Sequence, residues 1–203
     1  MPRFTPITQD ALAERIARQL RESGGQLVAV DGADAAHPLA FARLAAGRLR
    51  ADGRPAELVS VHDYVRPASL RMEFGRDETA YRTGWFDYPA LRREVLDPLR
   101  TDGRWLPALW DEAADRSARA LRRRASPGTV LFVAGPMLLG RDLPFDLTVR
   151  LDLSPAALAR HTAETDAWTV PALLAHDREH PEPPDYFLRW DHPDRPALRT
   201  EAG

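Results

Sequence analysis

The chain has 203 residues and a formal net charge of −2, and this length suits one domain over residues 1–203. The charge balance argues against nucleic acid as the main partner, because binding to a phosphate backbone usually needs a concentrated basic face. The absence of cysteine excludes disulfides, thiolate catalysis and cysteine metal sites, and all 28 basic residues are arginine.

Membrane and export signals are also missing from the sequence. No stretch approaches the length of a membrane span, and residues 1–20 lack the continuous apolar run of a signal peptide. We therefore expect a soluble cytoplasmic protein with no membrane partner.

The first predicted element is a short helix over about residues 8–23. Leu12, Ile16 and Leu20 recur at helical spacing after Thr8, a suitable N-cap, and two glycines end the helix. Apolar runs then predict five strands, at 27–30, 57–61, 129–135, 147–153 and 186–190. Helical patterns lie between most of them, at 39–50, 89–99, 155–161 and within 171–180. This alternation is typical of an α/β protein with a parallel sheet.

An arginine-rich stretch precedes the turn Ser126-Pro127-Gly128. We interpret it as the solvated face of a helix that ends at this turn, with anion binding as the alternative. The arginines are Arg116, Arg119, Arg122, Arg123 and Arg124.

The residues after the first strand have the strand–turn–helix pattern of a phosphate-binding loop but lack its phosphate-binding residues. Such a loop needs a glycine-rich turn, a lysine for the outer phosphates and a hydroxyl for Mg²⁺. On the pattern G-x-x-x-x-G-K-[ST], the second glycine becomes His37, the lysine Pro38 and the hydroxyl residue Leu39. Asp34 adds a carboxylate where polyphosphate charge would lie. An ordinary strand–turn–helix is the alternative for this remnant, which comprises Gly32, Ala33, Asp34, Ala35, Ala36, His37, Pro38 and Leu39.

The order and spacing of several segments resemble the uridine kinase family of P-loop nucleoside kinases over nearly the whole chain. These segments are VDGADAAHPLAFARLA, VSVHDYVRP, GWFDYPALRREVLDPL, LPALWDEAADR, GTVLFVAGPMLLG and FDLTVRLDLSPAALARH. The resemblance implies a three-layer P-loop NTPase fold of the nucleoside kinase type with a five-stranded parallel sheet. It also implies ATP and Mg²⁺ at the loop, and transfer of the γ-phosphoryl group to a nucleoside 5′-hydroxyl.

The resemblance also identifies candidate catalytic residues. His62 falls where the family has the aspartate that activates the sugar hydroxyl, and Asp63 is next to it. Histidine differs from aspartate in reach and charge, and adjacent strand residues point to opposite faces, so neither residue is a direct substitute. The acidic residue expected near the metal aligns with Ala134, which cannot orient the water shell of Mg²⁺.

Four further residues are candidate substrate contacts by the same resemblance. Asp87 falls where the family contacts the sugar hydroxyls, Trp110 where it often places a tyrosine beside the base, and Asp115 where it has a base-contacting histidine. Arg160 is retained from the arginine-rich lid helix of the family.

The substrate-side residues also have structural interpretations. Core packing is the favoured explanation for Trp85, Phe86 and Trp110, because aromatic side chains are mostly buried structural residues. Capping of the helix that begins at Pro89 would satisfy the carboxylate of Asp87.

Two histidines, His176 and His180, have the spacing of a zinc-binding helix. Glutamate does not follow the first of them, and Pro181 interrupts the helix directly after the second. We therefore expect no metal site there.

Three functions remain open. The first is a pseudokinase, without a cofactor, that has lost phosphoryl transfer and binds a nucleoside-like ligand or a protein partner. The second is an active phosphotransferase with ATP and Mg²⁺ in which arginines such as Arg43 and Arg160 replace the lysine. The third is a structural or interaction protein, for example in a homo-oligomer with an active relative. Losses at the lysine, hydroxyl and both acidic positions favour the first or the third, since charge and positioning supply most phosphoryl-transfer catalysis.

Any ligand is expected in a cleft at the C-terminal ends of the strands, where open parallel sheets place their crevices. The sequence predicts that His62, Asp63, Asp87 and Trp110 line this cleft.

Overall fold

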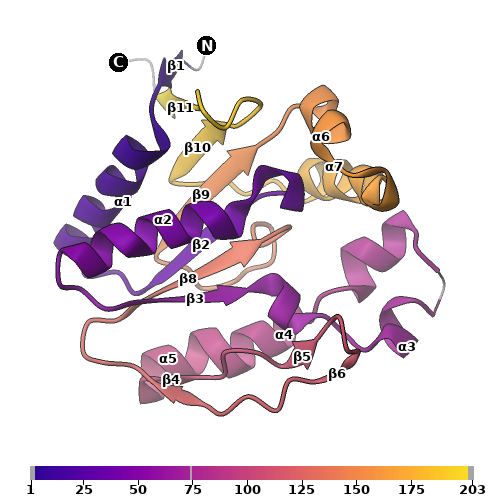
Figure 1. Ribbon diagram of the computed structural model, residues 1–203, viewed down its shortest axis with the longest axis horizontal. Helices are drawn as coiled ribbons and strands as arrows, with labels where there is room; N and C mark the ends of the chain where they lie inside the picture. The colour runs from indigo at the N-terminus through magenta and orange to yellow at the C-terminus, as the bar shows by residue number, and fades with distance from the viewer. Residues whose placement is uncertain (1–2, 74, 201–203) are drawn as a thin grey trace.

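The computed structural model describes residues 3–73 and 75–200, which surround one mixed β-sheet (Figure 1). Seven strands form the sheet in the order β1, β11, β10, β9, β2, β8, β3. Their bounds are β1 Arg3–Pro6, β2 Leu27–Asp31, β3 Ala56–Ser60, β8 Val130–Gly135, β9 Leu147–Asp152, β10 Tyr186–Arg189 and β11 Ala197–Thr200. The five strands expected from the sequence are therefore confirmed to within a residue or two at each end.

The sheet is larger than the sequence predicts. The strands β3, β8, β2, β9 and β10 run parallel to one another, as expected. Two further strands, β11 and β1, extend the β10 edge in antiparallel pairing. The expectation of a five-stranded sheet is thus wrong by two strands. Both are short and partly exposed, so their pairing depends on the neighbouring strand rather than on a local apolar run.

The helices α1 and α2 pack against each other, and α2 crosses the central strands (Figure 1). Helix α1 begins after Thr8, whose hydroxyl accepts a hydrogen bond from the Ala11 N–H, and ends at Gly24 with a φ of 72°. The helical elements of the first half are α1 Gln9–Ser23, η1 Asp34–Ala36, α2 Pro38–Ala51, η2 Val61–Tyr64, α3 Ala68–Arg71 and η3 Ala80–Gly84. Those of the second half are α4 Tyr88–Leu91, η4 Arg92–Leu96, α5 Asp97–Asp102, α6 Pro155–His161, η5 Glu164–Asp166 and α7 Thr169–Glu179.

The predicted helix at 89–99 is an irregular helical segment from α4 through η4 to α5. Its middle turn η4 is a π-helix, and Pro98 follows directly inside α5. Proline has no N–H to donate to the carbonyl four residues earlier, which belongs to Glu94. The N–H of Leu106 donates to that carbonyl instead, at 2.9 Å. The segment therefore stays helical despite its internal proline.

The arginine-rich stretch is not a helix. Arg116 and Ser117 form β6, which pairs with β5 (Trp110–Asp111), and Arg123 and Arg124 form β7, which pairs with β4 (Arg104–Trp105). The predicted helix is therefore wrong, whereas the five arginines are exposed to solvent as predicted. Arg119 has a φ of 50°, which a continuing α-helix does not allow.

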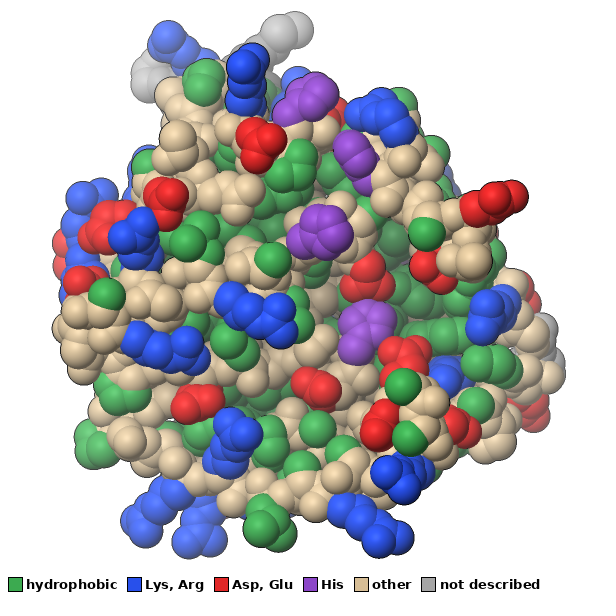
Figure 2. Space-filling view, in the orientation of Figure 1, with side chains coloured by type: hydrophobic (Ala, Val, Ile, Leu, Met, Phe, Trp, Pro, Cys, Tyr) green, Lys and Arg blue, Asp and Glu red, His purple; other side chains and the backbone are tan. Residues whose placement is uncertain are grey.

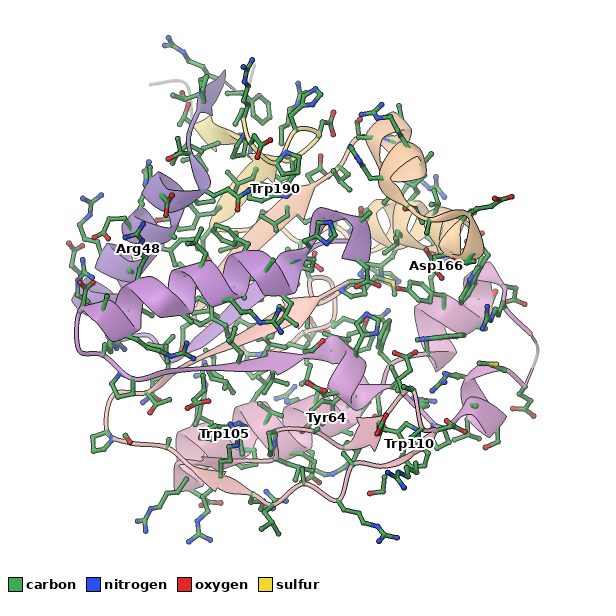
Figure 3. The ribbon with its side chains drawn as sticks, in the orientation of Figure 1. Arg48, Tyr64, Trp105, Trp110, Asp166 and Trp190 are labelled. Carbon is green, nitrogen blue, oxygen red and sulfur yellow. The ribbon has the colours of Figure 1, made fainter. Side chains whose placement is uncertain are left out.

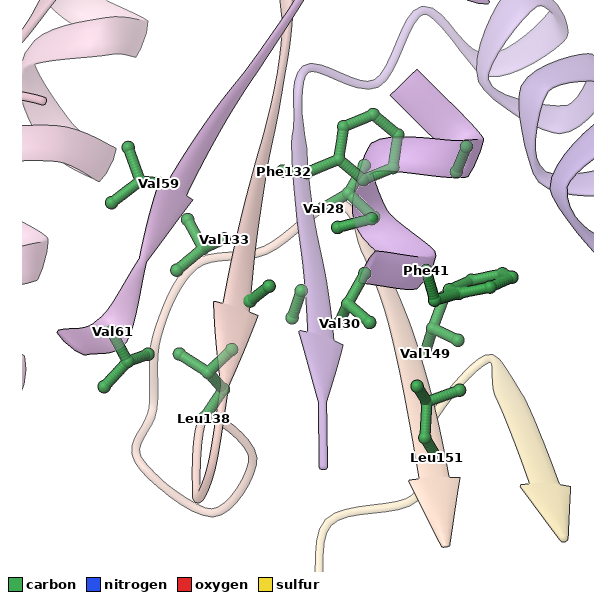
Figure 4. Packing of buried hydrophobic residues seen from close by; sticks show 14 of the residues in the cluster. Val28, Val30, Phe41, Val59, Val61, Phe132, Val133, Leu138, Val149 and Leu151 are labelled. Atoms are coloured by element: carbon green, nitrogen blue, oxygen red, sulfur yellow. The ribbon is translucent and has the colours of Figure 1, made fainter. Parts of the chain in front are cut away.

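The core lies around β2, whose five residues are all buried. Figure 4 shows Val28 and Val30 of β2 beside Phe41 of α2 and the valines of the neighbouring strands. Phe41 also packs edge-on against Trp190, with ring centroids 5.6 Å apart. A buried central strand of this kind fixes the position of the loop that leaves its C-terminal end.

Candidate functional site

The phosphate-loop remnant connects the central strand β2 to helix α2, as its sequence predicts. The residues between them close a short 3₁₀ turn on themselves. The N–H of Ala36 donates to the Ala33 carbonyl at 2.8 Å, and the N–H of His37 donates to the Asp34 carbonyl at 2.9 Å. A phosphate-binding loop works by directing such N–H groups at the anion. Both groups are already used within this turn.

His37 keeps one property of the glycine that the motif requires. Its φ is 53°, in the left-handed region where glycine is favoured, and it is the residue that precedes helix α2. His37 therefore adopts a backbone conformation for which glycine is favoured. Pro38 begins the helix, so the position of the lysine also lacks an N–H.

His62 lies between two carboxylates. Its Nε2 is 2.9 Å from Asp34 Oδ1 in the loop, and its Nδ1 is 2.9 Å from Glu112 Oε2 beyond β5. Burial by itself would lower the pKa of His62, but the hydrogen bonds and charges of both carboxylates outweigh it and raise the pKa to about 10. Near neutral pH the ring is therefore an imidazolium that donates from both nitrogens, and it has no free nitrogen to accept a substrate proton.

Glu112 is the partner that the sequence analysis missed. Its other oxygen accepts a hydrogen bond from the indole N–H of Trp85 at 3.2 Å. Burial raises the pKa of Glu112, whereas the His62 imidazolium lowers it, and the net direction is downward. Asp34, His62 and Glu112 thus form an ionic bridge from the loop to the segment after β5, which we call the carboxylate–histidine bridge. The only sequence signal for Glu112 was its place in the segment LPALWDEAADR.

Asp63 and Asp87 are both used by the local backbone. Asp63 accepts a hydrogen bond from the Ser60 N–H at 3.1 Å and completes a reciprocal cap on η2. Asp87 accepts one from the Ala90 N–H at 2.9 Å and caps α4, which agrees with its structural interpretation.

Trp110 and Asp115 bond to each other across a tight turn. The indole N–H of Trp110 donates to Asp115 at 3.0 Å, and the Ala68 N–H donates to the same carboxylate oxygen at 2.8 Å. In Figure 3, Trp110 lies beside the β5–β6 ribbon, whereas Asp166 lies beside the α6–α7 helices. Arg160 is exposed near the end of α6.

A cavity of about 430 Å³ lies beside the loop. Of the four residues expected to line the cleft, His62 does so, whereas Asp63, Asp87 and Trp110 do not, because backbone or side-chain partners hold them elsewhere. Figure 2 shows histidine and acidic side chains gathered on this face, between α2 and the α6–α7 pair. The lining residues are Ala33, Asp34, Ala35, His37, His62, Tyr81, Trp85, Glu112, His161, Thr162, Ala163, Asp166, Trp168, Thr169 and Leu173.

A second ionic network lies under the loop. Asp31 at the end of β2 is fully buried, accepts a hydrogen bond from the Leu138 N–H at 3.0 Å and pairs with Arg150 of β9. Arg150 also pairs with Asp177 of α7. Burial by itself lowers the pKa of Arg150, but its two carboxylate partners raise it overall, so it stays charged. This network fixes the end of β2 relative to α7.

His176 of α7 and His180, which follows the end of this helix, do not lie in a metal cluster. His176 is buried, and its Nε2 is 2.8 Å from the Leu139 carbonyl oxygen. Over residues 3–73 and 75–200, no group of three or more His, Cys, Asp or Glu side chains has the arrangement of a metal site.

In the same ranges, every helix is too short or too polar to cross a membrane.

The carboxylate–histidine bridge predicts a pH dependence of stability. Because folding raises the pKa of His62 from about 6.5 to about 10, its stabilisation is fully present below about pH 6.5 and is lost as the pH rises through about 10. His62→Gln should therefore lower the free energy of unfolding near pH 6 and change it little above about pH 10. Urea unfolding of both proteins across this range measures the difference, with the exposed His192→Gln as the control. A difference that stays constant with pH would contradict the imidazolium assignment.

Comparison with known proteins identifies the fold. No protein-family model and no curated protein sequence matches the chain. A possible uridine kinase from Bacillus stearothermophilus has a TM-score of 0.68 at 14% identity, over 83% of this chain and 91% of that one. A candidate fructose transport system kinase from Silicibacter sp. TM1040 has a TM-score of 0.69 at 24% identity, over 89% and 98%. The chain has the P-loop kinase fold.

The P-loop kinase fold explains why the bridge and the cavity lie where they do. Both are at the C-terminal ends of the parallel strands, at the crevice where such sheets bind ligands. The scaffold therefore agrees with the resemblance seen in the sequence.

Proposed function

We propose that this protein uses the P-loop kinase fold to bind a nucleoside-like ligand and does not transfer phosphoryl groups from ATP. The observation that carries the proposal is the carboxylate–histidine bridge. Both ring nitrogens of His62 are engaged by Asp34 and Glu112, so the residue at the expected catalytic position has no lone pair for a sugar hydroxyl.

The residues at the loop do not fit ATP and Mg²⁺. Pro38 and Leu39 supply neither the ammonium nor the hydroxyl that the nucleotide and metal need, and Ala134 is a buried strand residue without an oxygen ligand. Asp34 presents a half-exposed carboxylate on the same turn, which would repel the β- and γ-phosphates.

One observation favours the alternative of an active phosphotransferase. Arg43 lines a neighbouring cavity of about 230 Å³ together with His37, Leu39 and His62, so one arginine does lie beside the loop. Arg160 does not line either cavity. A single exposed guanidinium replaces neither the backbone N–H groups used in the 3₁₀ turn nor the metal ligands, and we consider this alternative weaker.

The larger cavity supports the nucleoside part of the proposal. Its volume of about 430 Å³ is within the usual range for small-molecule sites. Trp85 and Trp168 supply flat apolar surface for a base, with ring centroids 4.9 Å apart.

Calorimetric titration with uridine and with cytidine tests the proposal. We expect binding of at least one nucleoside, and Trp168→Ala should weaken it by roughly 1–3 kcal/mol if a base stacks there. Trp110→Ala is the matched control, because this tryptophan does not line the cavity, and it should leave the affinity unchanged. No binding of either nucleoside would contradict the proposal and would favour a structural or interaction role instead.

A further inference from the structure

The cavity beside the loop is acidic in a chain rich in arginine. Three carboxylates line it, from Asp34, Glu112 and Asp166. Although the chain has 28 basic residues, all arginine, none of the arginines described by the structure lines this cavity. The imidazolium of His62 offsets one negative charge, and the other basic side chains there are His37 and His161. The site therefore favours a positive ligand over a negative one.

Aromatic side chains form one wall of the same cavity. Tyr81 and Trp85 come from the turn around η3, and Trp168 from the turn before α7. The ring centroid of Trp168 is 5.3 Å from that of Tyr81 and 4.9 Å from that of Trp85, so the three rings form one cluster. Aromatic faces beside carboxylates attract organic cations through the ring quadrupole and the charge together.

Trp168 closes this wall at the edge of the cavity. Its indole Nε1 is buried and has no hydrogen-bond partner among the described residues, so the ring meets a ligand through its apolar surface. The aromatic wall and the three carboxylates together favour a ligand that combines a flat ring with a positive charge.

We propose that the cavity selects a protonated amine carried on a flat ring system, in place of the phosphorylated ligand that the fold would suggest. This inference rests on the proposed nucleoside-like ligand and specifies its charge. The ammonium group lies among Asp34, Glu112 and Asp166, and the ring lies against the cluster of Tyr81, Trp85 and Trp168. A monophosphate in the same place would meet three carboxylates.

Matched probes that carry a positive, a neutral or a negative group test the inference by calorimetry. The nucleoside set is 5′-amino-5′-deoxyuridine, uridine and uridine 5′-monophosphate, and the set without a sugar is tryptamine and tryptophol. Each amine should bind at least about tenfold tighter than its hydroxyl twin, the monophosphate should bind most weakly, and added salt should reduce the differences. Asp166→Asn should reduce the amine preference by roughly threefold to tenfold.

Glu164→Gln is the control variant, because Glu164 is an exposed carboxylate of the same turn that does not line the cavity. It should leave every affinity unchanged. Equal affinity of uridine and its amino twin would overturn this inference while supporting the proposed function. A preference for tryptamine without binding of any nucleoside would support the amine and overturn the nucleoside. Failure of both sets to bind would overturn both.

Discussion

Replacing Asp31 with alanine is expected to lower the free energy of unfolding by about 3–5 kcal/mol. The carboxylate is fully buried at the end of β2, between the Leu138 N–H and the guanidinium of Arg150. Its removal leaves a backbone donor unpaired and leaves Arg150 with a single carboxylate partner, Asp177. Chemical denaturation at neutral pH measures the loss.

The control for this prediction removes both charges of the pair. In Asp31→Val with Arg150→Met, the buried guanidinium that has lost one of its two carboxylate partners is also removed, so the double variant should be more stable than Asp31→Ala alone. A loss below about 1 kcal/mol for Asp31→Ala would mean that the network under the loop carries little of the stability.

Replacing Gly135 with alanine is expected to cost about 2–5 kcal/mol of stability. Gly135 ends β8 with a φ of 148°, and its carbonyl accepts a hydrogen bond from the Gly32 N–H of the loop. A Cβ at this position would be 2.8 Å from the Cβ of Val61, the residue directly before His62. The backbone around η2 must therefore shift, and this shift also displaces His62 from Asp34 and Glu112.

Gly47→Ala is the matched control, because a Cβ there meets nothing within 4 Å. Gly47 lies inside α2, so alanine should be neutral or should stabilise the helix by up to about 1 kcal/mol. Thermal unfolding of both variants gives the comparison. Equal stability of the two alanine variants would show that the chain around Val61 tolerates the extra carbon.

The regular elements were predictable because their signals are local. The apolar run of β2 specifies a buried strand, and the four-residue spacing of Leu12, Ile16 and Leu20 specifies the buried face of α1; neither pattern depends on distant residues. The strands β1 and β11 were missed because their pairing is decided by contact between the two ends of the described chain. The conformation of the arginine-rich stretch was missed because short antiparallel ribbons carry a weak sequence pattern.

The site was only partly predictable for a similar reason. His62 and the loop were found because they follow strand ends, where a parallel sheet collects functional residues. Asp63 and Asp87 have the residue type and place in the sequence of catalytic or substrate-binding residues. A carboxylate near the start of a helix is equally suited to capping, and the sequence pattern alone does not distinguish capping from a functional role. Glu112 and Trp168 reach the cavity from segments far away in the sequence, so only the tertiary structure identifies them.

The proposed function requires that the loop does not bind nucleoside triphosphates. Calorimetric titration of the unmodified protein with Mg²⁺–ATP at physiological salt tests it most directly. Two loop N–H groups are bonded within the 3₁₀ turn, Pro38 supplies neither an N–H nor an ammonium group, and the Asp34 carboxylate repels phosphate. We therefore predict a dissociation constant above about 1 mM for Mg²⁺–ATP. A dissociation constant in the micromolar range would contradict the account.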